Sequence, residues 1–88
     1  MHAVLVRVTI DDPEQAMKRL HEDVVPRVRE APGLVAGYWV RLDGNRGRSM
    51  VVFDSEEAAR AAAEQVRAMP AEFVTIDSVD VHEVVAHT

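Results

Sequence analysis

The first segment of the chain, residues 2–10 (HAVLVRVTI), carries apolar side chains on both of its alternating faces. The even-numbered positions from Val4 to Ile10 are all apolar, and Ala3 and Leu5 begin the other parity. Successive side chains of a β-strand point to opposite sides of a sheet, so this pattern predicts a strand that is apolar on much of both faces. Both faces of this strand therefore need apolar packing partners, and a chain of 88 residues has few elements to supply them.

Two segments carry the signals of helices. Residues 11–33 begin with two aspartates, either of which can cap a helix, and with a proline suited to the first helical turn. Pro26 has no amide hydrogen and its ring clashes with the preceding turn, so this helix should bend or break just before Pro26. Residues 55–69 begin with Ser55 as a natural N-cap and are rich in alanine, and Pro70 ends them. This second segment has the clearer helical pattern.

Three further segments are rich in β-branched residues and predict strands, namely residues 34–42, 49–54 and 72–88. The first two are joined by DGNRGR (residues 43–48), which has the Asp-Gly signal of a hairpin turn. In the last segment the apolar parity changes, which predicts a β-bulge near Ser78.

The predicted elements follow the order strand, helix, strand, strand, helix, strand. This is the order of the ferredoxin-like α+β fold, a four-stranded antiparallel sheet with two helices on one face, here formed as a single domain by residues 1–88. Helices on one face leave the other face bare, and a large bare apolar face usually marks an interface. Because a small domain gains stability from a partner subunit, we expect a homodimer in which two sheets pack face to face. The alternative is that the inner strands are simply apolar and no dimer forms.

Composition excludes several classes of protein. The chain has no cysteine, which excludes disulfides and thiolate metal sites, and its net charge of −5 disfavours general nucleic-acid binding. No apolar run reaches the roughly 18 residues of a membrane span, and the N-terminus lacks the pattern of a signal peptide, so a cytoplasmic location is expected. No pair of histidines has the spacing and carboxylate support of a metal site. We expect no nucleic acid, membrane, metal or bound cofactor.

Three stretches carry a resemblance to a known family: PGLVAGYWV (residues 32–40), VVFDSEEAARAA (residues 51–62) and the Val-rich final strand. With the order of elements, they make the chain similar to the dimeric α/β-barrel superfamily, and within it to the antibiotic-biosynthesis-monooxygenase-like (ABM) domains. The resemblance covers nearly the whole chain and consists of structural motifs rather than a catalytic signature. It implies a homodimer with a cavity between each sheet and its helices. The superfamily includes cofactor-independent monooxygenases and haem-degrading enzymes.

The aromatic pair Tyr38 and Trp39 bears on that implied cavity. Neighbours on a strand point to opposite faces, so the two rings cannot line one pocket together. The parity of Tyr38 is apolar apart from the phenol, so we expect it to face the helices, with Leu20 and Val24 completing the ligand pocket. The parity of Trp39 ends in Arg41, so we expect both residues at the dimer interface, with Arg41 at its rim. The alternative is that both rings are ordinary packing residues.

The candidate catalytic residues are His21 and Tyr38. A histidine on a helix that faces the cavity could give or take a proton near neutral pH, although the charged neighbours of His21 also suit an exposed helix face. The resemblance implies an Asn, a Trp and a His around the haem of haem-degrading relatives. The only asparagine here is Asn45, in the hairpin turn, so that set is not matched.

Arg41, Arg46 and Arg48 flank or occupy the hairpin turn. Such a cluster could bind a carboxylate or phosphate. It could equally be a solvated tip that keeps the sheet edge soluble.

Two functions are compatible with these expectations. The resemblance implies a small monooxygenase for an aromatic or polyketide-like substrate, which would itself form a carbanion and react with oxygen in a dry pocket. The lack of a charged acid–base pair in the predicted pocket favours instead a module that binds a small apolar ligand or a protein partner. The sequence does not choose between them.

Overall fold

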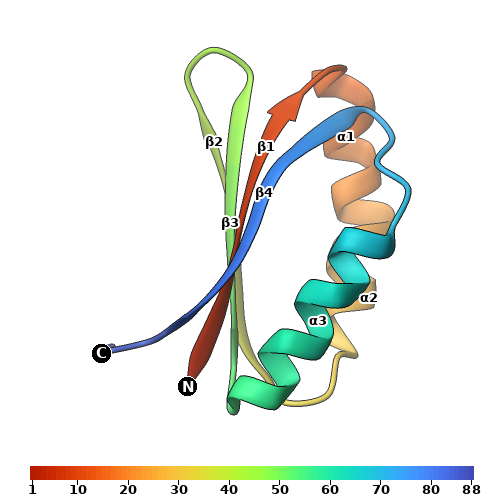
Figure 1. Ribbon diagram of the computed structural model, residues 1–88. Coiled ribbons are helices and arrows are strands. Elements are labelled where there is room, and N and C mark those ends of the chain that lie inside the picture. Colours follow the sequence, from red (N-terminus) through yellow and green to blue (C-terminus); the bar gives the residue numbers. More distant parts are fainter.

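The computed structural model describes residues 1–88 as a four-stranded antiparallel sheet with helices on one side (Figure 1). The elements in chain order are β1 (His2–Ile10), α1 (Pro13–Arg19), the π-helical turn η1 (Leu20–Val24), α2 (Val25–Arg29), β2 (Leu34–Leu42), β3 (Arg46–Phe53), α3 (Glu56–Ala68) and β4 (Val74–Glu83). The strand order across the sheet is β2-β3-β1-β4. This is the ferredoxin-like α+β fold that the order of the elements predicts.

Strand β1 lies in the middle of the sheet and pairs with β3 on one side and β4 on the other. Val4 is opposite Val51 in β3 and Val81 in β4, so the apolar positions of three strands form one row on the helix side. The register with β4 shifts between the partners Ser78 and Ile76. The bulge predicted near Ser78 is therefore confirmed.

The core lies between the sheet and α3. Val4, Val51 and Phe53 pack with Ala59 and Ala63 in one cluster. The two alanines are four residues apart, on one face of α3, and both have an exposed fraction of 0%. Small side chains at these positions let α3 approach the sheet closely. Even so, only nine of the 88 residues are buried, so the core is small for a chain of this length.

The helical segment of residues 13–29 packs differently. Asp12 caps it by accepting a hydrogen bond from the backbone N–H of Gln15 at 3.2 Å. The α-helical pattern is interrupted at η1, where the N–H of Val25 donates to the carbonyl of Leu20, five residues earlier. The interruption comes directly before Pro26, as predicted from its missing donor. None of the residues of α1, η1 or α2 is buried, so this segment covers the sheet without closing on it.

The sheet face opposite the helices is uncovered. Leu5, Tyr38, Val40 and Met50 lie on it with exposed fractions from 36% to 58%. Leu5 is opposite Met50, which in turn is opposite Tyr38, so these side chains form a continuous row across three strands. An apolar row of this kind extends over the centre of the sheet.

Gly33 forms the turn between α2 and β2. Its φ angle is +79°, a left-handed conformation that strains any residue with a Cβ. Its carbonyl accepts a hydrogen bond of 2.8 Å from the N–H of Asp54, which ties the turn to the end of β3. A Cβ at this position would lie only 2.6 Å from Oδ1 of Asp54. The turn therefore needs a glycine for two separate reasons.

We predict that Gly33→Ala lowers the free energy of unfolding more than Gly44→Ala does. Both glycines have positive φ, so each substitution costs about 1–2 kcal/mol for the left-handed backbone. A Cβ on Gly44 would meet nothing within 4 Å, whereas the one on Gly33 adds an overpacking cost of about 1–3 kcal/mol. Urea denaturation of the two variants measures the difference, and equal midpoints would contradict the clash.

Candidate functional site

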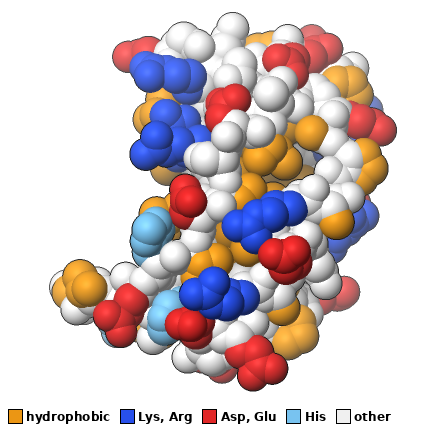
Figure 2. Space-filling model, viewed as in Figure 1, with side chains coloured by type: hydrophobic (Ala, Val, Ile, Leu, Met, Phe, Trp, Pro, Cys, Tyr) orange, Lys and Arg blue, Asp and Glu red, His pale blue; other side chains and the backbone are white.

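A cavity of about 280 Å³ lies between the helix-side face of the sheet and the helices. Of its 29 lining residues 20 are hydrophobic, so the cavity is an apolar site. Figure 2 shows hydrophobic side chains gathered in the hollow between the sheet and the helices. The sheet contributes Val6, Val8, Val51 and Ile76, the segment of residues 13–29 contributes Met17, Leu20 and Val24, and α3 with the loop after it contributes Val66 and Met69.

The cavity exists because the two helical walls approach the sheet differently. The alanines of α3 let that helix pack directly on β1, β3 and β4, whereas the segment of residues 13–29 has no fully buried side chain. Met17, Leu20 and Val24 point their apolar surface at the space between them and the sheet. Apolar walls that do not touch lose the dispersion energy of close packing, so the space favours an apolar occupant.

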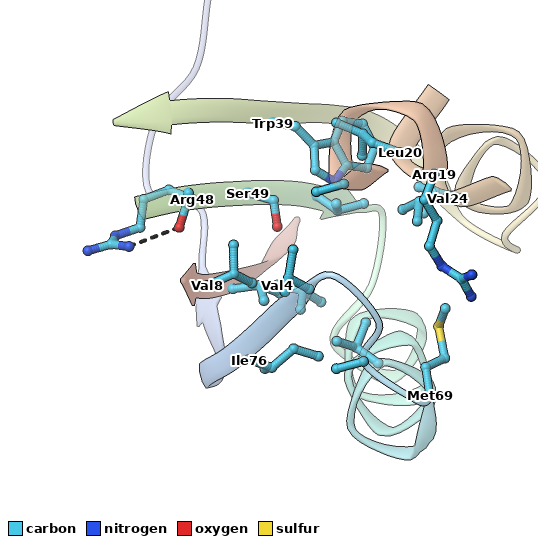
Figure 3. Close-up of a pocket in the computed structure, with 18 of the residues that line it drawn as sticks. Val4, Val8, Arg19, Leu20, Val24, Trp39, Arg48, Ser49, Met69 and Ile76 are labelled. Carbon is cyan, nitrogen blue, oxygen red and sulfur yellow. Dashed lines mark hydrogen bonds between the residues drawn. The ribbon is translucent and has the colours of Figure 1, made fainter. Parts of the chain in front are cut away.

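Trp39 lines this cavity and packs against the core cluster (Figure 3). Its indole lies over Gly37, where a Cβ would be 3.0 Å from Cη2 and 3.1 Å from Cζ3 of the ring. On the neighbouring strand the residue opposite Trp39 is Ser49, another small side chain. Small residues beside and across from Trp39 therefore make the room that the indole occupies.

The predicted orientation of the aromatic pair is wrong. Tyr38, expected in the pocket, lies on the uncovered face with an exposed fraction of 58%, and Trp39, expected at the dimer interface, lies beneath the helices. The reason is a bulge in β2 at Val35, where the register with β3 shifts between Leu34 and Ala36. Leu34 packs on the helix side, as its parity predicted. After Leu34 the extra residue shifts the alternation by one, so each later side chain of β2 lies on the face opposite to the predicted one.

Arg41 has the same parity as Trp39 and therefore also lies on the helix side, so its predicted orientation toward the dimer interface is wrong as well. It lines the cavity, two residues further along the same face of β2.

The three hairpin arginines do not form one binding cluster. Nε of Arg46 donates to the carbonyl of Asp43 at 3.1 Å, and Arg48 donates to the carbonyl of Gly47 at 2.9 Å and points away from the other labelled side chains in Figure 3.

The remaining sequence candidates divide between the cavity and the surface. Leu20 and Val24 line the cavity, where they were expected. His21 is exposed and does not line it, and Tyr38 does not line it either, so neither candidate catalytic residue reaches the site. The polar residues that line the cavity include Ser49 and Gln65, which were not predicted from the sequence. The small residues around Trp39 were the available signal for its orientation.

One ion pair spans the cavity from one wall to the other. Nη1 of Arg19 in α1 donates to Oε2 of Glu72 at 3.2 Å, and both residues line the cavity. Arg19 also contacts Asp23, which in turn binds Arg27 at 3.0 Å. Glu72 belongs to the loop between α3 and β4, so this pair joins the segment of residues 13–29 to that loop.

That loop is held by the backbone as well. Phe73 has a φ of +68°, an unfavourable conformation for an aromatic residue. Its carbonyl accepts two hydrogen bonds, from the N–H of Asp11 at 2.8 Å and from the N–H of Asp12 at 3.1 Å. These bonds fix the loop to the start of α1 and so set the width of the cavity at this end.

The cavity has no group of three His, Asp or Glu side chains that could hold a metal ion, nor does any other part of the structure. None of the helices is long and apolar enough to cross a membrane.

No protein-family model matches the chain, and no curated protein matches it. Solved structures do. HapK from Hahella chejuensis is 13% identical with a TM-score of 0.74, over 100% of this chain and 96% of that one. The heme-degrader MhuD from Mycobacterium tuberculosis, with two hemes bound in its active site, is 20% identical with a TM-score of 0.71, over 100% and 99%. The monooxygenase ActVA-Orf6 of Streptomyces coelicolor, in complex with nanaomycin D, is 16% identical with a TM-score of 0.64, over 99% and 89%.

The chain has the fold of the ABM-like domains. The structural likeness extends over 100% of this chain for both HapK and MhuD. At these identities the likeness concerns the fold and does not carry residues over from one protein to another.

A haem in this cavity would need a ligand for its iron among the lining residues. Haem iron is held in proteins by His, Cys, Tyr or Met side chains. The lining has no His, Cys or Tyr, and its sulfur atoms are the thioethers of Met17 and Met69. The residues present therefore do not fit a haem held by a histidine.

Proposed function

We propose that the cavity of this ABM-like protein binds a small aromatic or polyketide-like molecule. The observation that carries the proposal is an apolar cavity of about 280 Å³ bordered by the one tryptophan of the chain. Ligand pockets are typically about 300–1,000 Å³, so the space is near the lower limit and suits a molecule of two or three fused rings. The flat indole of Trp39 offers a stacking surface for such a ring system.

A cavity-filling substitution tests this proposal. Ala16 lies on α1 and lines the cavity, so Phe at this position can project into the space without displacing a buried residue. We predict that Ala16→Phe weakens binding of the neutral two-ring probe 2-naphthamide about tenfold or more, which is about 1.4 kcal/mol or more of binding free energy. The matched control is Ala61→Phe, an exposed position on α3 outside the cavity, which should leave binding unchanged.

Isothermal titration calorimetry measures both affinities, and the fluorescence of Trp39 reports on the cavity independently. Far-UV circular dichroism shows whether each variant keeps the fold. Absence of binding to the wild-type protein, or equal affinity for both variants, would contradict the proposed site.

We also propose that the protein is a homodimer formed through the uncovered face of the sheet. The small core supports this, because a chain with nine buried residues gains much from further burial. The row of Leu5, Met50 and Tyr38 supplies an apolar surface at the centre of that face. Arg7 and Arg48, which are opposite one another on the same face, and Asp80 beside Leu5 provide charges of both signs around it.

The dimer can be tested with one added carboxylate. Tyr38 is 58% exposed, so a single chain can accept Tyr38→Asp with little loss of packing. In a dimer the same carboxylate would be buried without a partner, which is costly. We predict a dimer for the wild-type protein at micromolar concentration, a monomer for Tyr38→Asp, and a dimer for the control Val85→Asp, since Val85 is 89% exposed near the chain end. Sedimentation velocity distinguishes these outcomes, and a monomeric wild-type protein would refute the dimer.

A second candidate function is a monooxygenase that works without a cofactor of its own. The structural likeness to a monooxygenase over 99% of this chain favours it. Because the lining contains no histidine and its one carboxylate, Glu72, is paired with Arg19, the protein offers no free base in the cavity. The substrate would therefore have to be acidic enough to form its carbanion readily, and the cavity would contribute a dry, apolar environment for its reaction with oxygen.

Oxygen uptake separates the two candidates. Anthrone forms a stabilised carbanion and has the size of a three-ring ligand. A monooxygenase should accelerate oxygen consumption in the presence of anthrone, and Ala16→Phe should abolish the acceleration while Ala61→Phe retains it. Binding of 2-naphthamide without any acceleration of oxygen uptake would leave the binding function and exclude this reaction.

A further inference from the structure

The lining of the cavity has the opposite charge to the chain as a whole. The chain has a net charge of −5, whereas the charged lining residues are four arginines and a single glutamate. Arg48 turns its guanidinium away from the cavity, and Arg19 and Arg27 are matched by Glu72 and Asp23. One positive charge in the lining is left without a counter-charge, that of Arg41.

Arg41 makes no ion pair and donates no side-chain hydrogen bond. Across the sheet it is opposite Gly47, which has no side chain to offer it. The nearest side-chain atoms above Gly47 belong to Val8 and Ile10, at 2.9 and 3.6 Å from the position of an added Cβ. Arg41 therefore lines an apolar space, and no group of the protein engages the donors of its side chain.

The position of Arg41 relative to Trp39 defines what that ligand can be. The two residues are on the same face of β2 with one residue between them, so their Cα atoms are roughly 7 Å apart. An aromatic ring stacked on the indole can thus present a substituent at its end to the guanidinium. A carboxylate fits this group best, since arginine binds carboxylates through two parallel hydrogen bonds.

We infer that the cavity takes an aromatic carboxylate, with its rings against Trp39 and its carboxylate bound by Arg41. The inference rests on the proposed function, because it names the class of ligand for the same cavity. The net negative charge of the chain works against binding of any anion at long range. A preference for the acid over a neutral analogue therefore has to come from a local group.

The experiment compares 2-naphthoate with 2-naphthamide, which has the same shape and no charge, by isothermal titration calorimetry. We expect the wild-type protein to bind the carboxylate on the order of tenfold more tightly, in line with a charge-assisted bidentate pair. Arg41→Gln should remove that preference and change the affinity for 2-naphthamide far less, because the Gln amide can still donate a hydrogen bond to the carbonyl of this probe. Arg29→Gln is the matched control, with the same change of charge at an exposed arginine outside the cavity, and should keep the preference.

The outcomes separate this inference from the function on which it rests. If the wild-type protein binds both probes equally, or if Arg41→Gln keeps the preference, the assignment of Arg41 is wrong and the aromatic site stands. If neither probe binds, the proposed function fails and the inference fails with it. Circular dichroism of Arg41→Gln verifies the fold, which an exposed side chain at the end of β2 should not affect.

Discussion

A sheet that is apolar on both faces governs the rest of this structure. The inner strand β1 presents Val4, Val6 and Val8 to the helices, and Ala3 and Leu5 to the other side. A βαββαβ chain has helices for one face only, so the second apolar face stays uncovered within one chain. The fully buried core is small for the same reason, because the apolar surface is shared between two faces. This division explains why the proposed dimer and the proposed ligand would both contribute to stability.

The helix α3 and the segment of residues 13–29 cover the helix-side face of the sheet in different ways. In α3, the buried alanines Ala59 and Ala63 leave no space between helix and sheet. In residues 13–29 larger side chains face the sheet from further away, and the π-helical turn before Pro26 changes the direction in which they point. The Arg19–Glu72 pair and the backbone bonds to Phe73 then hold the walls at this separation. The cavity thus results from the separation between the segment of residues 13–29 and the sheet, and not from a small side chain within the core.

The chemistry of the cavity is simple, and this limits what the protein can contribute to a reaction. Its walls are mainly aliphatic, its aromatic lining residues are Trp39 and the buried Phe53, and its one uncompensated charge is Arg41. Such a site can bind and orient a ligand and exclude water from it. It offers no free base, so a substrate would have to lose its proton without help from a lining residue. ABM-like folds accommodate ligands as different as the two hemes of MhuD and the nanaomycin D of ActVA-Orf6. The fold alone therefore does not specify a ligand, and the residues that line a cavity decide which ligand it can hold.

Much of the architecture can be predicted from the sequence because it depends on local patterns. The order of the elements, the hairpin turn (residues 43–45 in the structure, within the predicted 43–48), the interruption before Pro26 and the bulge near Ser78 all follow from proline, glycine and apolar alternation. The alternation also shows that Tyr38 and Trp39 lie on opposite faces.

Which face each aromatic ring takes is decided only by the tertiary structure. Both parities of β2 are largely apolar, and the charge of Arg41, which favoured the open side for its parity, lies in the cavity lining instead. The single extra residue at Val35 reverses the strand after Leu34, and its position depends on the pairing with β3, a contact between distant parts of the chain. The same reversal carries Arg41 to the cavity. The sequence by itself determined the fold and the alternation of its side chains, whereas the pairing of β2 with β3 determined which of them form the site.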